Sequence, residues 1–328
     1  MAIVPVREGG ELPEVRFEEE IRPENGFCSK NYLATSVVVA AVAAAVFSVC
    51  FSASMVFVAL SAWCLWSAAL IAANRVSVGT CMKKPVHLLY SMAMEVNSGV
   101  KAAALFPFTL FGSYHKPQGN LAGRPILMIN GYLSFGSTWH YQRQRLIEAG
   151  LGPVYTMNVG SFKSIETYAK YVKEIVDQIK AETGRNDITL ICHSKGGLVG
   201  SYYATHFAEG TDVSEIITIG SPLSGTPVAY IGPGYDASEM RPNSDLVLRL
   251  RDKIRHSTTR FFHIASKMDE VVPFSSAHPE GHHPHATKHV IEDIGHLGLV
   301  FSSRVADKIC QWLKECDHHR HHDEAAVV

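Results

Sequence analysis

The sequence predicts an α/β fold, a mostly parallel sheet with helices on both faces, preceded by N-terminal transmembrane helices. Two observations support this prediction. After residue 117, short apolar runs typical of buried strands alternate with helical patterns, which favours a parallel sheet. Before it, residues 31–74 form a stretch of 44 residues without Asp, Glu, Lys, Arg or His, which is longer than an ordinary core element.

The overall composition excludes some classes of protein. The 328 residues include 30 Lys and Arg against 31 Asp and Glu, a formal net charge of -1. Binding nucleic acid by bulk electrostatics requires a surplus of cations, so that class is excluded. Apolar residues make up 47% of the chain, which excludes a disordered protein. Seven cysteines without a CxxC pair indicate neither a disulfide framework nor a structural zinc site.

The charge-free run predicts a membrane anchor. One crossing of a bilayer needs about 20 helical residues, so the run fits a two-helix hairpin over residues 32–74 better than a single span. Cations flank both ends of the run while its uncharged turn has none, which favours placing the catalytic domain on the cytoplasmic side. The alternatives are a single tilted span, a cleaved signal peptide and a buried helix pair.

Apolar residues also recur at helical spacing between residues 85 and 112, at Val86, Leu89, Met92, Val96 and Val100. A helix here could lie on the membrane surface or pack against the downstream domain. The sequence supports the two interpretations equally.

The elements of the α/β part follow in chain order. Strands are expected over residues 125–129, 153–158, 188–192, 216–219, 261–265 and 288–292. Helices are expected over residues 137–149, 165–179, 198–207 and 305–313, the first two followed by Gly150 and Gly184 at cap positions. In such sheets the functional loops lie at the carboxyl ends of the strands.

The loop after the third strand has the pattern of a nucleophile elbow. It reads Cys192-His193-Ser194-Lys195-Gly196, between a strand and a helix. A serine on such a sharp turn has its hydroxyl exposed, and small residues on either side relieve the crowding. Gly196 fills the second small position of G-x-S-x-G, whereas Cys192 occupies the first.

Two later loops supply an acid and a histidine. Asp269 and Glu270 follow the fifth strand, and His296 follows the sixth. Serine, then acid, then histidine is the chain order of a catalytic triad on this kind of sheet.

These segments resemble those of α/β-hydrolases in the lipase/esterase superfamily, above all compact bacterial triacylglycerol lipases. The resemblance spans residues 122–315, about 60% of the chain. It rests on residues 129–133, 192–198, 220–229, 269–273 and 295–298. After its first core strand the family usually shows His-Gly, where this sequence has Asn130-Gly131.

The resemblance implies a role for each site residue. Ser194 attacks an ester carbonyl, His296 takes its proton and returns one to the leaving alcohol, and Asp269 orients His296. The backbone N–H groups of Tyr132 and Lys195 hold the developing oxyanion. The elbow is completed by Cys192, His193 and Gly196.

Some assignments have alternatives. Glu270 and Asp293 could replace Asp269 as the acid, although Asp269 comes first after its strand. His193 is expected to be a structural neighbour of the elbow and not a second base. The Lys195 side chain is expected to be solvated, the alternative being contact with anionic lipid heads.

The predicted function is that of a membrane-anchored serine hydrolase that cleaves carboxylic esters of lipids. Acyltransferase, phospholipase and thioesterase activities would use the same triad, and an inactive membrane scaffold is a further alternative. The expected partners are a lipid or other ester substrate and the bilayer, without nucleic acid or cofactor. Twelve of the 17 histidines lie from His256 onward, but no spacing marks a closed metal site, so no metal is assigned.

The chain is therefore expected to contain several parts. They are an acidic tail (1–31), a transmembrane hairpin (32–74), a connecting segment (75–118), an α/β-hydrolase domain (119–317) and a His-rich tail (318–328). Within the domain, residues 221–260 belong to no predicted strand and are expected to form a modest cap over an acyl pocket.

Overall fold

The computed structural model describes residues 85–110, 117–208, 212–281 and 283–326. The chain divides into two units, Met1–Phe57 and Val58–Val328, and all described residues belong to the second. The predicted acidic tail and transmembrane hairpin lie outside the described residues. Among the residues described, no helix combines the length and apolar character needed to span a membrane.

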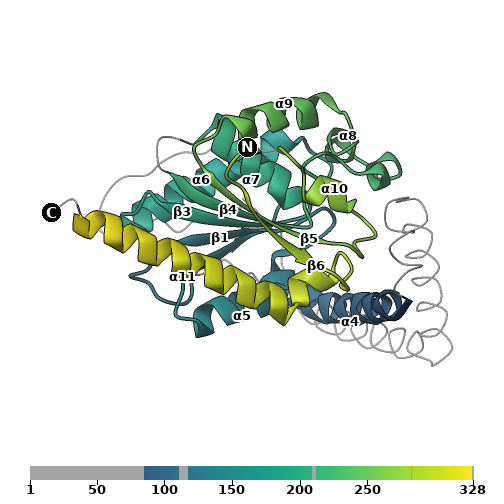
Figure 1. Ribbon diagram of the computed structural model, residues 1–328, viewed down its shortest axis with the longest axis horizontal. Helices are drawn as coiled ribbons and strands as arrows, with labels where there is room; N and C mark the ends of the chain where they lie inside the picture. The colour runs from purple at the N-terminus through teal and green to yellow at the C-terminus, as the bar shows by residue number, and fades with distance from the viewer. Residues whose placement is uncertain (1–84, 111–116, 209–211, 282, 327–328) are drawn as a thin grey trace, which may run out of the picture. The chain divides into compact units, whose positions relative to one another are not determined.

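Six parallel strands form the central sheet (Figure 1). They are β1 (Ile126–Ile129), β2 (Val154–Met157), β3 (Ile188–His193), β4 (Val213–Ile219), β5 (Arg260–Ser266) and β6 (Thr287–Ile291). The order across the sheet is β2-β1-β3-β4-β5-β6, and every neighbouring pair is parallel. The six predicted strands are confirmed, with ends that differ by at most three residues.

Helices cover both faces of this sheet (Figure 1). One face carries α6 (Ile165–Thr183), α7 (Lys195–His206) and α9 (Asp245–Arg255), and the other carries α5 (His140–Glu148) and α11 (Ser303–Ala326). Alternate residues of a strand point to opposite faces. Leu127 and Ile129 of β1 therefore join the first apolar layer, while Ile126 and Met128 join the second. The expected arrangement of a parallel sheet between two helical layers is confirmed.

Helices α6, α7 and α11 extend beyond their predicted limits, and α6 runs to Thr183, directly before Gly184. Helix α7 begins at Lys195, directly after the predicted nucleophile and three residues before the expected start. Its first turn contains Gly196 and Gly197, whose low helix propensity hides the helix from a pattern search. Helix α11 continues to Ala326, since neither Gly nor Pro interrupts residues 303–326. Most of the predicted His-rich tail is therefore helical.

The predicted cap at residues 221–260 contains a core helix. The short elements η2 (Pro227–Tyr230) and α8 (Tyr235–Glu239) form the cap itself. Helix α9 then packs on α7 and buries Leu246, Val247, Leu250 and Ile254, which recur at helical spacing. Its start is fixed by the Ser244 hydroxyl, which accepts a hydrogen bond from Val247 N at 3.2 Å. The cap is therefore shorter than predicted and ends before α9.

The connecting segment contains the expected helix, α4 (Pro85–Leu110). It packs against the short 3-10 helices η1 (Gly136–Trp139) and η3 (Gly298–Phe301). Its buried side chains include three polar ones, Ser91, Glu95 and Ser98. Packing against the domain, one of the two interpretations of this segment, is therefore observed, and it places polar groups at the contact.

Candidate active site

Ser194 lies in a strained turn between β3 and α7. Its φ of 53° and ψ of -126° lie in a region that L-residues rarely adopt. The backbone holds this turn at both sides, because Ser194 N donates to Ile219 O at 2.9 Å and Gly197 N donates to Ser194 O at 2.9 Å. Such strained residues concentrate at functional sites. The turn between β3 and α7 has the strand-turn-helix geometry of a nucleophile elbow.

The residues around Ser194 are small because neighbouring strands approach closely. A Cβ atom on Gly196 would lie 2.4 Å from Ile129 O, and one on Gly197 would lie 2.2 Å from Ser221 Oγ. Cys192 replaces the usual first glycine and is fully buried. Gly200 accommodates it, since a Cβ at that position would lie 2.7 Å from Cys192 Sγ. Gly200 of helix α7 therefore provides the space for the larger side chain of Cys192 at the first position of G-x-S-x-G.

Asp269 and His296 form a buried acid–base pair. His296 Nδ1 lies 2.8 Å from Asp269 Oδ2. The other oxygen, Oδ1, accepts hydrogen bonds from Val271 N at 2.9 Å and Val272 N at 2.7 Å. A carboxylate only accepts hydrogen bonds, so His296 carries its proton on Nδ1 and leaves Nε2 unprotonated. Nε2 is the atom that would take a proton from a serine hydroxyl.

The two alternative acids have other contacts. Glu270 Oε2 accepts a hydrogen bond from the backbone N–H of His296 at 3.1 Å. Asp293 is paired with Arg304 at 2.5 Å. Among the three candidates, Asp269 is the one whose carboxylate meets the His296 ring.

His296 and His193 differ in their electrostatic environment. Burial opposes the charged form of His296, but the Asp269 charge, its hydrogen bond and the Glu270 charge outweigh this effect and raise the pKa of His296. Burial, reinforced by the charge of His296, holds the pKa of His193 well below its ordinary value. His193 Nε2 lies 3.2 Å from the carbonyl oxygen of His296. A neutral His193 can donate a hydrogen bond from Nε2 to this carbonyl group of the histidine loop. Its role as a structural neighbour stays a prediction.

Gly220 leaves space for the acid–base pair at the end of β4. Its φ is 53°, and an added Cβ would lie 3.0 Å from Asp269 Oδ2 and 3.3 Å from His296 Nδ1. Gly220→Ala is therefore expected to separate these two groups and lower kcat by about 10²-fold. Ester hydrolysis under saturating substrate measures this effect.

Gly184→Ala is the matched control for that substitution. Gly184 has a similar φ of 68° but no heavy atom within 4 Å of an added Cβ. Both variants bear the same type of backbone strain, of about 1 kcal/mol. Equal kcat values in the two variants would contradict the proposed contact at Gly220.

The loop after β1 lies against the elbow. A Cβ on Gly131 would come within 2.9 Å of Ser194 Cβ, so glycine permits this approach. Asn130 replaces the usual histidine. Its Oδ1 accepts a hydrogen bond from Val159 N at 2.6 Å, and its Nδ2 donates to Ser134 O at 2.6 Å, to Gly131 O at 3.3 Å and to Val159 O at 3.4 Å. The side chain at this position therefore joins the loop after β1 to the loop after β2.

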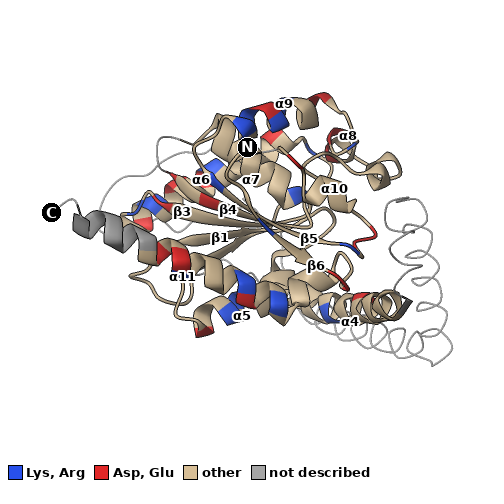
Figure 2. Ribbon diagram, viewed as in Figure 1, with Lys and Arg blue, Asp and Glu red and all other residues tan. Residues whose placement is uncertain are grey.

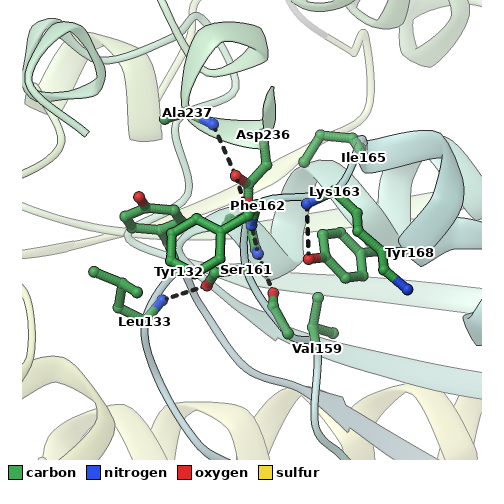
Figure 3. A network of polar contacts seen from close by, with 12 residues as sticks. Tyr132, Leu133, Val159, Ser161, Phe162, Lys163, Ile165, Tyr168, Asp236 and Ala237 are labelled. Atoms are coloured by element: carbon green, nitrogen blue, oxygen red, sulfur yellow. Dashed lines mark hydrogen bonds and ion pairs between the residues drawn. The ribbon is translucent and has the colours of Figure 1, made fainter. Parts of the chain in front are cut away.

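The backbone N–H groups of Tyr132 and Lys195 have no acceptor within the described part of the chain. The neighbouring Leu133 N donates to Ser161 Oγ at 3.0 Å (Figure 3). Leu133 adopts a positive φ of 50°, so this hydrogen bond stabilises an uncommon backbone conformation beside Tyr132.

The Lys195 side chain is fully buried, so the expectation of a solvated lysine is wrong. Its Nζ lies 2.7 Å from Asp236 Oδ2 and donates a hydrogen bond to Gly160 O. It also lies 4.3 Å from the ring centroid of Tyr168. Asp236 belongs to α8, and its Oδ1 accepts from Phe162 N at 3.1 Å and from Ala237 N at 3.0 Å (Figure 3). The ion pair thus joins the elbow, the loop after β2 and the cap.

A mainly apolar cavity of about 220 Å³ opens beside Ser194. Its walls come from the loop after β1, the cap and the loop after β5, and they include Val228, Ile231, Met240 and Val272. Such a cavity fits a hydrocarbon group next to the serine hydroxyl.

The described histidines between residues 278 and 285 contact different groups, and two of them contact each other, since His285 N donates to His283 Nδ1 at 3.3 Å. His283 Nε2 lies 3.1 Å from Ser257 O, and His278 stacks on Phe274. Within the described residues no group of three or more His, Cys, Asp or Glu side chains is arranged so that it could hold a metal ion.

Sequence reasoning missed three residues around this site: Glu95, Gly220 and Asp236. Glu95 had a local signal, because it is the single acidic residue in the apolar pattern of residues 85–112. Gly220 lies in the segment 220–229 that contributes to the family resemblance, but no role was assigned to it. Asp236 had no local signal, because its partner Lys195 is distant in the sequence.

Several known proteins resemble this chain. Residues 154–259, about a third of the chain, match the family described as "PGAP1-like alpha/beta domain". No functionally curated protein matches significantly. The structure is similar to the Bacillus licheniformis lipase BlEst2 in its mature form, with a TM-score of 0.52 and 16% identity over 60% of this chain and 94% of that one. For the propeptide form the TM-score is 0.51, with 16% identity over 60% of this chain and 52% of that chain. The described residues from β1 onward therefore have the α/β-hydrolase fold.

Proposed function

We propose that this protein is a serine hydrolase that cleaves carboxylic ester bonds of lipids. The observation that carries the proposal is the placement of a strained turn at Ser194 and a buried Asp269–His296 pair at the carboxyl ends of strands in one parallel sheet. The Nε2 atom of His193, the residue before Ser194, lies 3.2 Å from the carbonyl oxygen of His296. The α/β-hydrolase fold and the resemblance of the chain to lipases and esterases support it at a coarser level.

The reaction follows from the roles of these groups. Ser194 Oγ attacks the ester carbonyl carbon while its proton passes to His296 Nε2. The Tyr132 and Lys195 N–H groups stabilise the oxyanion of the tetrahedral intermediate. The intermediate then expels the alcohol, which takes the proton from His296 and leaves an acyl group on Ser194. Water, deprotonated by His296, attacks the acyl carbon of this acyl-enzyme. The bond from the acyl carbon to Ser194 Oγ then breaks, His296 returns the proton to Oγ, and the carboxylic acid is released.

The apolar cavity beside Ser194 supports a lipid substrate. Its walls offer mainly hydrocarbon surface, and burial of apolar area stabilises a bound acyl chain. Large apolar side chains near its mouth, among them Leu133, Tyr230 and Ile231, are more than half exposed. An exposed apolar rim of this kind is typical of a site that meets lipid.

Helix α4 supports action at a membrane surface. It turns polar side chains towards the domain and leaves Val86, Leu89 and Val100 more than 60% exposed. Glu95 and Lys101 are its only charged residues (Figure 2). The helix also follows the charge-free run of residues 31–74, so an anchored protein would present this apolar face next to the bilayer.

Labelling with a fluorophosphonate probe tests the proposed chemistry. Wild type is expected to become covalently labelled and Ser194→Ala to remain unlabelled, since the probe reacts with an activated serine. Esters of graded acyl length, with phospholipids and thioesters included, then define the substrate. An unlabelled wild type beside a reactive control hydrolase would refute the proposal, and activity that falls steadily with acyl length would refute its lipid part.

A further inference from the structure

Glu95 of helix α4 reaches the loop that carries His296. Its side chain is only 2% exposed. Oε1 accepts a hydrogen bond from Gly298 N at 2.6 Å and Oε2 accepts one from Leu297 N at 3.1 Å. The carboxyl group therefore satisfies two consecutive backbone donors directly after the histidine.

The histidine loop is shaped to admit this side chain. A Cβ on Gly295 would lie 2.4 Å from Glu95 Cγ, and a Cβ on Gly298 would lie 3.0 Å from Glu95 Oε1. Both glycines of the Gly295-His296-Leu297-Gly298 segment thus leave room for one residue of a distant helix. This fit is hard to explain if α4 merely covers the sheet.

Glu270 completes the arrangement from the other side. Its Oε2 accepts from His296 N at 3.1 Å, and its carboxyl group is hydrogen-bonded to that of Glu95. Three successive N–H groups, those of residues 296, 297 and 298, are therefore held by two buried carboxyl groups. A hydrogen bond between two carboxyl groups requires a proton on one of them.

The electrostatics of the pair agree with a shared proton. Burial and the neighbouring Glu270 charge raise the pKa of Glu95 well above its ordinary value. Burial and the Asp269 charge raise the pKa of Glu270. Two adjacent buried carboxylates cannot both be ionised at low cost, so this arrangement favours a proton shared between them.

We propose that Glu95 is a positioning residue that fixes the His296 loop from helix α4, with Glu270 as its partner. This inference rests on the proposed Ser194–His296–Asp269 chemistry. The hydrogen bonds of Glu95 go to the backbone of the histidine loop, and Glu95 is not among the residues that line the apolar cavity. It therefore acts on the rate of reaction and not on substrate binding. It also couples the catalytic loop to the helix that follows the predicted membrane anchor.

Two substitutions of similar volume test the proposal. Glu95→Met keeps the bulk of the side chain but removes the acceptors for residues 297 and 298. Glu95→Gln keeps one acceptor oxygen and a donor for Glu270. Ester hydrolysis is expected to show a kcat about 10²-fold lower for Glu95→Met, with KM within about threefold of wild type. The kcat of Glu95→Gln is expected to be at least about tenfold higher than that of Glu95→Met.

Ser98→Ala provides the control on the same helix. Ser98 is fully buried on the domain side of α4, and its hydroxyl has no hydrogen-bond partner among the described residues. Its removal is expected to leave kcat and KM unchanged. Circular dichroism of all variants verifies that they are folded.

The outcomes separate this inference from the proposed function. A wild type that neither hydrolyses esters nor reacts with the fluorophosphonate probe would overturn both. If wild type is active and Glu95→Met has a similar kcat, only the positioning role is overturned. The same holds if wild type is active and Glu95→Met and Glu95→Gln lose kcat equally. If Glu95→Met does not fold, the test rests on Glu95→Gln, which is expected to lower kcat at least about threefold at constant KM. A kcat of Glu95→Gln equal to that of wild type would then overturn the inference.

Discussion

Ser194→Ala is expected to lower kcat for ester hydrolysis by about 10⁶-fold, because the covalent intermediate can no longer form. Asp269→Asn is expected to lower it by about 10⁴-fold. The asparagine amide would donate to His296 Nδ1 and so stabilise the tautomer whose Nε2 carries a proton and cannot accept one from serine. The measurement is hydrolysis of a chromogenic ester, with active-site titration to count the functional molecules.

The control for the serine is Ser201→Ala. Ser201 is a buried residue of α7, and its hydroxyl lacks a hydrogen-bond partner within the described chain. This variant should keep the activity of wild type. If Ser194→Ala retained more than about a tenth of the wild-type kcat after titration, another residue would have to be the nucleophile.

The pH profile of the same enzymes reports on His296. Burial opposes its charged form, but the charge of Asp269 and the hydrogen bond to Asp269 together outweigh burial, so the pKa of His296 is raised. His296 must be neutral to act as a base, and activity is therefore lost as the pH falls through this raised pKa. Asp269→Asn removes the charge, so the acidic limb of its residual activity should move to lower pH.

Local patterns predicted most of the fold. Each buried strand is a short apolar run, and the predicted cap residue Gly184 follows the end of α6 in a left-handed conformation. Helix α9 escaped prediction although Leu250 and Ile254 follow a helical spacing, because it was grouped with the cap that precedes it. The membrane hairpin remains a prediction.

The site residues differed in how far the sequence could place them. Ser194, Asp269 and His296 follow separate strands, and a parallel sheet brings such loops to one edge. The roles assigned to them stay predictions, but their proximity follows from topology. The surroundings of Lys195 could not be derived in this way. Its partner Asp236 lies in a short cap helix, and no local pattern shows that a carboxylate 41 residues away closes over the lysine.

The Lys195–Asp236 pair is expected to be the most costly ion pair to break. Both side chains are fully buried, and removing one partner leaves a buried charge without compensation. Lys195→Met is therefore expected to lower the free energy of unfolding by about 3–5 kcal/mol. Urea denaturation followed by circular dichroism measures this change.

Two further variants show whether the loss comes from the unpaired charge. Adding Asp236→Asn to Lys195→Met removes the remaining charge while its Oδ1 can still accept from Phe162 N and Ala237 N. The double variant should therefore regain a large part of the lost stability.

Lys173→Met is the control, since the Lys173–Asp177 pair lies on the exposed surface of α6. Its change in the free energy of unfolding should stay within about 0.5 kcal/mol. A double variant no more stable than Lys195→Met would mean that lost packing around Tyr168, and not the unpaired charge, accounts for the effect. Equal losses in Lys195→Met and Lys173→Met would contradict the burial of the pair altogether.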